Sequence, residues 1–314
     1  MKNYLWLFAC LLLLSSCGKK GTEQLPVAIG EPYHVMVVAA DSTAAKPIVE
    51  LLAADMSGLP QPEPTFDVQL VKPEEAEKPQ CRYARALVHI DIDKKKYNSA
   101  DVGYKHDRWA RGQLVLNITS PSADLLGQMV WRNARKLVGL LVDHEMNQAK
   151  QRFSRRANTM AASEVKRLFG IDMLVPASLT SMKKGKHFIW LSDGSRQRQN
   201  ICVYTVEGRL PERDMNHRDS VMRVNIKGET DNMYMTTVKD GLRFLDMGQG
   251  QTLTRGLWEM KDDSMGGPFV ERTVFLGDRT LVAEAFVYAP ESKKRNLIRE
   301  LEAALNSIKI YKSE

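Results

Sequence analysis

The sequence predicts an α+β protein of two domains, each with a mainly antiparallel or mixed sheet and packed helices, joined by a long, broken helix. The chain has 314 residues, more than one hydrophobic core usually serves. Its 43% apolar and 26% charged residues are typical of a globular protein and exclude a disordered chain. Strand and helix patterns mix in the first half, and strands separated by turns dominate the second.

Residues 1–16 have the anatomy of a secretory signal peptide. Lys2 lies near the start, and the apolar core of residues 5–14 is far shorter than the roughly 20 residues that span a bilayer. The core leads into Leu14-Ser15-Ser16-Cys17, which resembles the bacterial lipobox. That resemblance implies cleavage before Cys17 and attachment of fatty acyl chains, such as palmitate, to this residue. The alternative is an ordinary signal peptide in which Cys17 is incidental.

We predict that residues 17–30 form a lipidated tether, because the residues after Cys17 are mostly small and polar. Each buried methylene contributes roughly 0.8 kcal/mol, so two or three acyl chains hold a protein at a membrane essentially permanently. The tether has no acidic run of the kind that resembles a surface-export signal in some gram-negative lipoproteins. We therefore expect a protein of the cell envelope, anchored in the membrane by its lipid and facing the periplasm. Inner and outer membrane both stay open.

The chain is basic, with a formal charge of +7, or +6 (7 − 1) once Lys2 leaves with the signal. Outside the cytoplasm this balance favours an envelope glycan or a lipid headgroup as a partner over nucleic acid. Solubility alone is the other explanation. Beyond Cys17, only Cys81 and Cys202 remain, in different predicted domains. We expect both to be buried and unpaired, and a disulfide between them is the alternative.

The first domain is predicted over residues 31–170. The apolar run of residues 33–40 predicts a buried strand, and Asp41 and its hydroxyl neighbours can cap the helix that follows. Further strands are predicted at residues 66–71, 85–93 and 113–119, with a polar excursion between the last two.

A helical pattern begins at Ser122 and continues to Phe169, where Gly170 can end it. This is long for one helix of a globular protein. Polar and basic residues crowd the stretch between Asn147 and Asn158, so we expect a break there and expect the whole segment to join the two domains.

The second domain is predicted over residues 171–314 as antiparallel strands closed by a terminal helix. Strands are expected at residues 187–191, 200–206, 234–238, 254–260, 270–276 and 280–288. Residues 219–226 fit either a short helix or a strand. The terminal helix is amphipathic, with Leu297, Leu301, Leu305 and Ile308 on one side.

Signatures of common enzyme classes are missing from the chain. It has no Gly-x-Ser-x-Gly elbow, no Walker loop, no His-Glu-x-x-His and no Cys-x-x-Cys pair. Its status as an enzyme is therefore uncertain; we favour a protein that is not one, and expect no cofactor and no metal. His89, Asp91 and Asp93 share a strand face and can bind a divalent ion. A solvated face explains the same pattern, and three lysines next to it oppose a cation.

Two segments are candidates for ligand binding. Residues 104–111 mix aromatic and basic groups, which can stack on a sugar or bind a phosphate or carboxylate. The candidates there are Tyr104, His106, Arg108 and Trp109, although a strand pair with Trp109 packed on the core explains the same string. The second segment holds Trp258 and Gly266-Gly267-Pro268, where the backbone either turns tightly or approaches another group closely.

Several motifs also occur together: Gly256-Leu257-Trp258 and residues 265–270, with weaker support from residues 109–111, 218–220, 286–290 and 294–295. Together they resemble an uncharacterised family of Bacteroides-type envelope lipoproteins, carried as a domain of unknown function. The resemblance covers nearly the whole mature chain and implies a location but no activity. Such bacteria attach O-glycans at Asp-Ser or Asp-Thr before a small or apolar residue, which makes Ser42, Ser220 and Ser264 candidate glycosylation sites.

Taken together, these features predict a lipid-anchored periplasmic envelope protein with a binding or assembly role. Its expected partners are the membrane, through the N-terminal lipid, and an envelope glycan, a lipid headgroup or an envelope protein. The alternative is an envelope hydrolase or transferase with an unrecognised site, in which His106, Asp107 and Arg108 supply acid–base or charge-stabilising groups.

Overall fold

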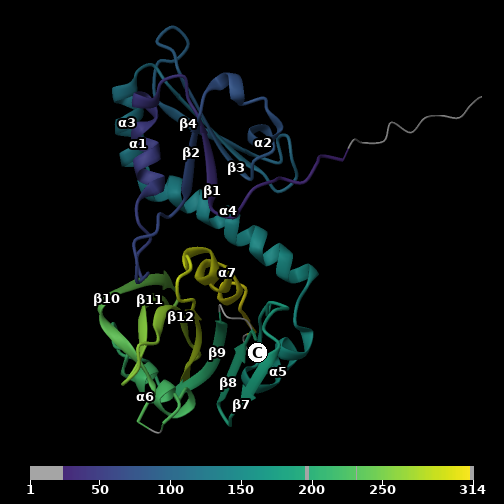
Figure 1. The fold of residues 1–314 in the computed structure, drawn as a ribbon, viewed down its shortest axis with the longest axis vertical. Coiled ribbons are helices and arrows are strands. Elements are labelled where there is room, and N and C mark those ends of the chain that lie inside the picture. The colour runs from purple at the N-terminus through teal and green to yellow at the C-terminus, as the bar shows by residue number, and fades with distance from the viewer. Residues whose placement is uncertain (1–23, 195–197, 231, 312–314) are drawn as a thin grey trace, which may run out of the picture.

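The computed structural model describes residues 24–194, 198–230 and 232–311, which form two α+β domains joined by a long helix (Figure 1). The predicted fold class is confirmed. The predicted signal peptide, Cys17 and the first part of the predicted tether lie outside the described residues. Within the described ranges, no helix is both long and apolar enough to cross a membrane.

The N-terminal domain is built on a five-stranded mixed sheet with the strand order β2-β1-β3-β5-β4. Its strands are β1 (His34–Val38), β2 (Asp67–Val71), β3 (Ala86–Ile92), β4 (Asp101–His106) and β5 (Leu114–Ser120). All are parallel except β4, which pairs antiparallel with β5 at the edge. Strand β4 lies where the sequence predicts only a polar excursion. Nearly all of its residues are exposed, so it has no hydrophobic alternation to reveal it.

Helices cover both faces of this sheet (Figure 1). Helices α1 (Ser42–Ala53) and α3 (Ala123–Arg132) and the first turns of α4 (Ala134–Arg155) cover one face, where Ile48 and Leu126 are fully buried. The short helix α2 (Pro79–Arg82), preceded by the 3₁₀ helix η1 (Pro73–Glu75), lies on the other. Asp41 accepts a hydrogen bond from the backbone N–H of Thr43 and so caps α1 as predicted.

The predicted long helix consists of α3, α4 and α5 (Thr159–Phe169). The expected break between Asn147 and Asn158 is confirmed, because helical geometry ends at α4 and resumes at α5. A second break, which was not predicted, occurs at Asn133. Its side-chain amide donates to the carbonyl oxygen of Met129 (2.9 Å), a local hydrogen bond that competes with regular helix.

The C-terminal domain contains a seven-stranded antiparallel sheet with the order β10-β11-β12-β13-β9-β8-β7. Its strands are β7 (Ser181–Lys184), β8 (Phe188–Ser192), β9 (Arg198–Glu207), β10 (Met235–Gly248), β11 (Gln251–Met260), β12 (Gly266–Phe275) and β13 (Arg279–Tyr288). Strands β6 (Ile171–Asp172) and β14 (Lys309–Ile310) form a separate short pair. Strand β10 extends ten residues beyond its predicted end at Val238, since its outer half is exposed and irregularly paired.

Each face of this sheet has its own hydrophobic core. Helices α5 and α7 (Arg295–Leu305) pack on one face with the end of α4, and α6 (Asn216–Asn225) packs on the other. The predicted terminal helix is confirmed as α7, and the segment left open between helix and strand is α6. Helix α5 buries Val165 and Phe169 in the C-terminal core, so this core begins one helix before the predicted boundary at Gly170.

The two domains meet where α7 begins. The carboxylate of Glu63, from the N-terminal domain, accepts hydrogen bonds from the backbone N–H groups of Lys294 (2.7 Å) and Arg295 (3.0 Å). The Arg295 guanidinium donates to Asp67 (2.6 Å) and to the carbonyl oxygen of Pro64 (2.8 Å). Glu63, Lys294 and Arg295 are buried, so these contacts tie α7 to the N-terminal domain.

The end of the predicted tether belongs to the N-terminal domain. The backbone N–H of Arg111 donates to the carbonyl oxygen of Pro26 (2.7 Å), and its own carbonyl accepts from Ala28 (2.9 Å). Ile29 donates to the carbonyl oxygen of Tyr83 (2.8 Å). Residues from 26 onward are therefore held against the domain and do not act as a free linker.

Both cysteines within the described residues are buried and free, Cys81 in the N-terminal domain and Cys202 in the C-terminal sheet. Burial raises the pKa of each thiol. They pack as small hydrophobic side chains, as expected.

Candidate binding site beneath helix α6

Helix α6 and the segment before it leave a pocket against the sheet, which we call the α6 pocket. Its lining comes from residues 209–217, from the β10–β11 hairpin, and from Glu271, Thr273, Phe275 and Thr280. The cavity volume of ≈ 420 Å³ lies within the range of small-molecule sites. A larger cavity of ≈ 650 Å³ lies near His187 and Arg279, and the titratable side chains in its lining are all exposed. Of these two cavities among the described residues, the α6 pocket is the one whose lining includes buried polar side chains, namely Thr254, Glu271 and Thr280.

Strand pairing makes the floor of the pocket polar, because residues opposite one another on neighbouring strands share a face. One row across the sheet contains Asp246, Thr252 and Thr273. The next row contains Phe244, Thr254, Glu271 and Glu284. Two carboxylates on adjacent strands, Glu271 and Glu284, thus face the underside of α6.

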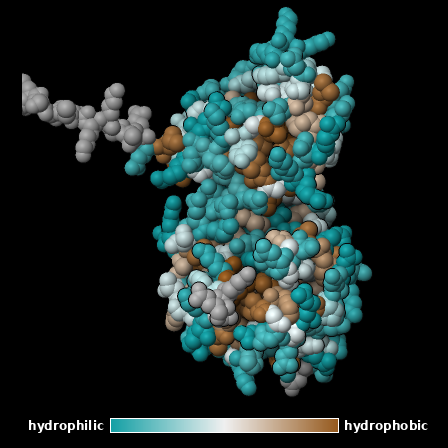
Figure 2. Space-filling view, turned by 180° about the vertical axis from the view of Figure 1, so that it is seen from behind, coloured by the Kyte–Doolittle hydropathy of each residue, from teal (hydrophilic) through white to brown (hydrophobic). Residues whose placement is uncertain are grey.

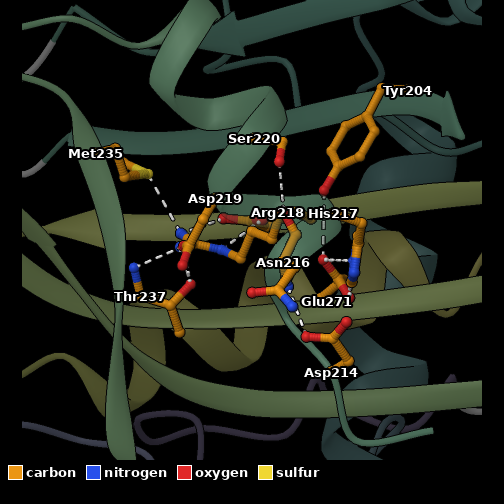
Figure 3. A network of polar contacts seen from close by, with 11 residues as sticks. Tyr204, Asp214, Asn216, His217, Arg218, Asp219, Ser220, Met235, Thr237 and Glu271 are labelled. Carbon is orange, nitrogen blue, oxygen red and sulfur yellow. Dashed lines mark hydrogen bonds and ion pairs between the residues drawn. The ribbon is translucent and has the colours of Figure 1, made fainter. Parts of the chain in front are cut away.

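The first turn of α6 supplies the partners of these carboxylates. Asp214 accepts a hydrogen bond from the backbone N–H of Asn216 (2.9 Å) and so fixes the start of the helix. His217 and Arg218 follow directly, and Figure 3 shows both side chains directed from the helix towards the sheet. Met222, four residues after Arg218, lies on the same buried helix face.

His217 and Glu271 form a buried pair at the floor of the pocket. The Nε2 atom of His217 lies 3.1 Å from each carboxylate oxygen of Glu271, and the Tyr204 hydroxyl donates to that carboxylate at 3.4 Å (Figure 3). The two side chains are 7% and 1% exposed. Burial opposes charge on the imidazole, but the hydrogen bond and negative charge of Glu271 raise the pKa of His217 above its ordinary value.

Arg218 forms a second, fully buried ion pair with Glu284. Its Nε and Nη2 atoms donate to the two oxygens of Glu284 at 2.9 and 2.8 Å, a bidentate geometry. Its Nη1 atom donates to the hydroxyl of Thr237 (2.7 Å), which in turn donates to Asp219 (2.6 Å). The guanidinium also lies 4.2 Å from the ring centroid of Phe269. Arg218 thereby connects α6 to strands β10, β12 and β13.

Burial dominates the protonation of Glu284. Loss of water raises its pKa from 4.5 to about 7, although the charge of Arg218 acts in the opposite direction. Its cross-strand neighbour Glu271 adds a further upward shift, because a second negative charge this close disfavours ionisation of Glu284. Beneath α6, Glu284 therefore changes its charge near neutral pH.

The charged groups around the pocket are largely engaged, whereas several neutral groups are not. Asp246 accepts from the backbone N–H of Gly248 (2.8 Å), and the Arg209 guanidinium lies 4.1 Å from the ring centroid of Phe275. The described residues offer no side-chain hydrogen bond to three hydroxyls of the floor: Thr252, Thr254 and Thr273. Thr252 and Thr273 are half-buried, so their hydroxyls are available to a ligand, whereas Thr254 is 2% exposed.

The four predicted ligand residues of the N-terminal domain lie on two faces of its sheet. Tyr104 and His106 lie on the face of α4, where the His106 ring centroid is 5.8 Å from that of His144. Arg108 and Trp109 lie on the face of α2, with the guanidinium 4.3 Å from the Trp109 ring centroid. The structure does not bring all four together.

Trp258 lies in the core on the α6 side of the C-terminal sheet, outside the pocket lining. It is 2% exposed, and its indole N–H donates to the carbonyl oxygen of Val287 (3.2 Å). A Cβ atom on Gly267 would lie 2.1 Å from that same oxygen. Of the two interpretations of the Gly-Gly-Pro segment, close approach to another group is therefore the one that holds.

The three candidate glycosylation serines are exposed. Ser42 is the first residue of α1, and Ser264 lies in the β11–β12 turn. The hydroxyl of Ser220 donates to the carbonyl oxygen of Asn216 one turn earlier in α6 (2.8 Å). Glycosylation of these serines stays a prediction.

Residues 24–194, 198–230 and 232–311 contain no group of three or more metal-ligating side chains in a suitable arrangement. At the strand considered for a divalent ion, Asp91 accepts from the Tyr97 hydroxyl (2.6 Å). Lys96 lies 3.7 Å from Asp91 and 3.5 Å from Asp93. These contacts fit a solvated surface.

Two family models match the chain, and each corresponds to one structural domain. Residues 158–307 match Domain of unknown function (DUF4837), and residues 28–154 match Domain of unknown function (DUF8532). Each of the two matches covers less than half of the chain. The predicted resemblance to an uncharacterised family of this kind is confirmed. The α6 pocket lies entirely within the DUF4837 domain.

No curated protein matches the chain. One similar solved structure is a Bacteroides thetaiotaomicron VPI-5482 protein determined at 1.50 Å resolution, with 10% sequence identity and a TM-score of 0.28. The alignment covers 46% of each chain, so this chain spans about half the length of that protein.

The α6 pocket is absent from the sequence-based candidates. His217 and Glu271 are 54 residues apart, and only strand pairing and the position of α6 bring them together. One signal was available: Glu284 is a charged residue inside the apolar run of β13, whose neighbours on both sides are buried. A charge in such a strand requires a partner, and that partner is Arg218.

Proposed function

We propose that this protein is a lipid-anchored periplasmic envelope protein whose DUF4837 domain binds a neutral, polyhydroxylated ligand, such as part of an envelope glycan, in the α6 pocket. The observation that carries the binding site is its floor, where buried charges are paired with one another and threonine hydroxyls are left without partners. Cys17 in its lipobox-like sequence supports the anchor.

The groups left for a ligand are neutral hydrogen-bond donors and acceptors. Besides the hydroxyls of Thr252 and Thr273, the side-chain amide N–H groups of Gln251 are free, because its side-chain oxygen is the atom that accepts from Arg272 (2.8 Å). The rings of Phe244 and Phe275 add apolar surface to the same pocket. Hydroxyl groups and apolar ring faces on one small molecule are the combination that a saccharide offers.

A strongly charged ligand fits less well. The outer wall carries Arg209 and Arg213 but also Glu212, Asp214 and Asp246, so neither sign dominates. At the floor, the charge of His217 is balanced by Glu271. The pocket therefore has no net field that would attract a phosphate or an amine.

Binding of saccharides to the mature chain tests this function directly. Calorimetric titration with N-acetylglucosamine, galactose and soluble envelope glycan fragments should give saturable heat with at least one of them. Thr252→Val and Thr273→Val should each weaken that binding by roughly 2- to 12-fold, the equivalent of one net hydrogen bond. Thr236→Val, on the opposite face of β10, is the matched control and should bind as wild type does.

Failure of all these saccharides to bind at millimolar concentration would remove the proposal. Equal affinity of the floor variants and the Thr236→Val control for the saccharide would exclude the α6 pocket as its binding site.

The anchor is tested separately. Cys17→Ala should move the protein from the membrane fraction to the soluble periplasmic fraction and abolish incorporation of labelled fatty acid. An unchanged membrane fraction with unchanged labelling would exclude lipidation at Cys17.

A hydrolase or transferase is the second candidate, and the His217–Glu271 pair favours it, because a carboxylate that orients an imidazole is a recurring acid–base arrangement. If the bound glycan is cleaved or transferred, Glu271→Gln should lower turnover at least 100-fold while binding stays within a few-fold of wild type. Binding without turnover in the wild-type protein excludes this candidate.

A further inference from the structure

We infer that the N-terminal domain docks against the anionic lipid headgroups of the membrane that holds the anchor. The surface involved, here named the anchor-proximal surface, consists of Leu25, Val27, Ile29, Arg108, Trp109 and Arg111. The inference rests on the proposed lipid at Cys17 and is independent of the α6 pocket.

The length of the tether requires this surface to lie near the bilayer. Arg111 binds the backbone of Pro26, so the chain is fixed to the domain only nine residues after Cys17. A fully extended segment of that length spans at most about 30 Å. Figure 1 shows the chain leaving the N-terminal domain on the side that carries α2. An anchored Cys17 therefore directs this side, and not α1 or α3, towards the membrane.

Apolar side chains gather where the described chain begins. Leu25, Val27 and Ile29 are 41%, 60% and 46% exposed, and Figure 2 shows apolar surface at the base of the N-terminal segment. The carbonyl and N–H groups of this segment are bonded to Arg111 and Tyr83, which holds the side chains in place. Exposed apolar groups next to cations are typical of surfaces that bind the membrane interface.

Trp109 and its neighbours supply the groups that favour anionic headgroups. The Trp109 ring lies between two guanidinium groups, with Arg108 at 4.3 Å and Arg82 at 5.7 Å from its centroid. Tryptophan is enriched at membrane interfaces, and arginine binds phosphate through its fork of donors. Ligand binding in the α6 pocket does not involve this aromatic and basic cluster. Its position on the side towards the membrane gives the cluster a function of its own.

Three acidic side chains on this side, Glu75, Glu77 and Asp107, are already engaged. Glu77 pairs with Arg82 (2.5 Å), Glu75 pairs with Lys78 (2.8 Å), and Asp107 accepts from the backbone N–H of Gly112 (2.6 Å). Among the described residues, neither Arg108 nor Arg111 has an ion-pair partner. Their positive charge is therefore available to phosphate groups of the bilayer.

Distance from the bilayer tests the inference in the lipidated, full mature protein. Spin labels are attached to Val27→Cys and, as the distant match, to Val224→Cys, since both valines are highly exposed and Cys81 and Cys202 are buried. The protein is reconstituted in vesicles of phosphatidylcholine with 30% phosphatidylglycerol and a nickel-chelating lipid. We expect the label at position 27 to relax at least threefold faster than the label at position 224.

Charge reversal identifies the contact that sets this orientation. Arg108→Glu with Arg111→Glu should reduce the difference between the two labels to less than 1.5-fold. Lys46→Glu with Arg132→Glu, on the helices of the opposite face, should leave it unchanged. Replacing phosphatidylglycerol by phosphatidylcholine should reduce the difference as the arginine reversal does.

Equal relaxation at both positions, with lipid on Cys17 verified by mass spectrometry in the same sample, would overturn the docking surface alone. Absence of that lipid would overturn the proposed anchor and, with it, this inference. A difference that persists after the arginine reversal would also overturn docking through these charges.

Discussion

Arg218 and Glu284 are both 0% exposed. Each is the main partner whose opposite charge offsets the free-energy cost of burying the charge of the other in the core. Arg218→Met would leave an uncompensated carboxyl group in this interior. We expect it to lower the free energy of unfolding by about 3–5 kcal/mol, measured by urea denaturation. The double variant Arg218→Met with Glu284→Gln removes the charge conflict and should be more stable than the single variant.

Lys46→Met is the matched control, because it breaks an exposed pair with Glu50 on α1. Its cost should stay below about 0.5 kcal/mol. An Arg218→Met protein no less stable than this control would contradict the importance of the buried pair.

The same cluster predicts how stability depends on pH. Glu284 has a pKa of about 7 in the folded protein and returns to its ordinary 4.5 on unfolding. Between these values the folded state binds more protons than the unfolded state, so the free energy of unfolding falls as the pH rises. The raised pKa of His217 acts in the same direction, because its contribution is lost as the pH passes through the folded value.

Burial lowers the pKa values of His89 and His144, so these two groups act in the opposite direction over the same pH range. The contribution of Glu284 is therefore the difference between wild type and Glu284→Gln: in urea denaturation, raising the pH from 5 to 8 should cost wild type more of its free energy of unfolding than it costs Glu284→Gln. An equal change in both proteins would show that the pKa of Glu284 is not raised as described.

At the residue scale, sequence patterns identify roles that depend on neighbours in the chain. Asp41 caps a helix because the N–H that it accepts from is two residues away. Glu271 and His217 gain their roles from strand register and from the position of α6, which no local pattern encodes. Trp258 illustrates the opposite error, since a conspicuous residue type proved to be a buried core group.

At the scale of secondary structure, α7 depends on a residue from the other domain. Glu63 accepts from the backbone N–H groups of Lys294 and Arg295, where α7 has no side-chain cap of its own. Glu63→Ala leaves these N–H groups buried and unpaired, and we expect a loss of about 1–3 kcal/mol in the free energy of unfolding. Hydrogen exchange of the first turn of α7 should accelerate as well.

Glu50→Ala is the control, because this glutamate is exposed on α1 and contacts only Lys46 among the described ion pairs. Equal effects of Glu63→Ala and Glu50→Ala would mean that the contact between domains does not stabilise α7.

Elements with a buried apolar pattern were predictable, and those without one were not. The terminal helix follows from Leu301, Leu305 and their spacing. Strand β4 and the outer half of β10 are exposed on both faces, so only hydrogen bonds to a neighbouring strand define them. The sequence pattern did not predict the break at Asn133, because the helical spacing of apolar residues continues through it.

At the scale of the whole molecule, each of the two domains carries one of the proposed functions. The proposed anchor-proximal surface lies on the N-terminal domain and on the segment that leads into it, and the α6 pocket lies in the region that matches DUF4837. The contacts between Glu63, Asp67 and Arg295 join the two domains. Chain length predicted two domains and the lipobox-like sequence predicted a location, but the sequence alone did not show which domain holds the site.

Hydrogen exchange measured by mass spectrometry tests most directly whether a ligand binds in the α6 pocket. It locates the binding site without requiring that the ligand be identified first. The mature protein is compared with and without a saturating mixture of soluble envelope glycan fragments. We predict slower exchange in peptides covering residues 209–217 and 251–275, with the N-terminal domain unchanged. Protection confined to peptides covering residues 104–109, or no protection anywhere, would contradict ligand binding in the α6 pocket.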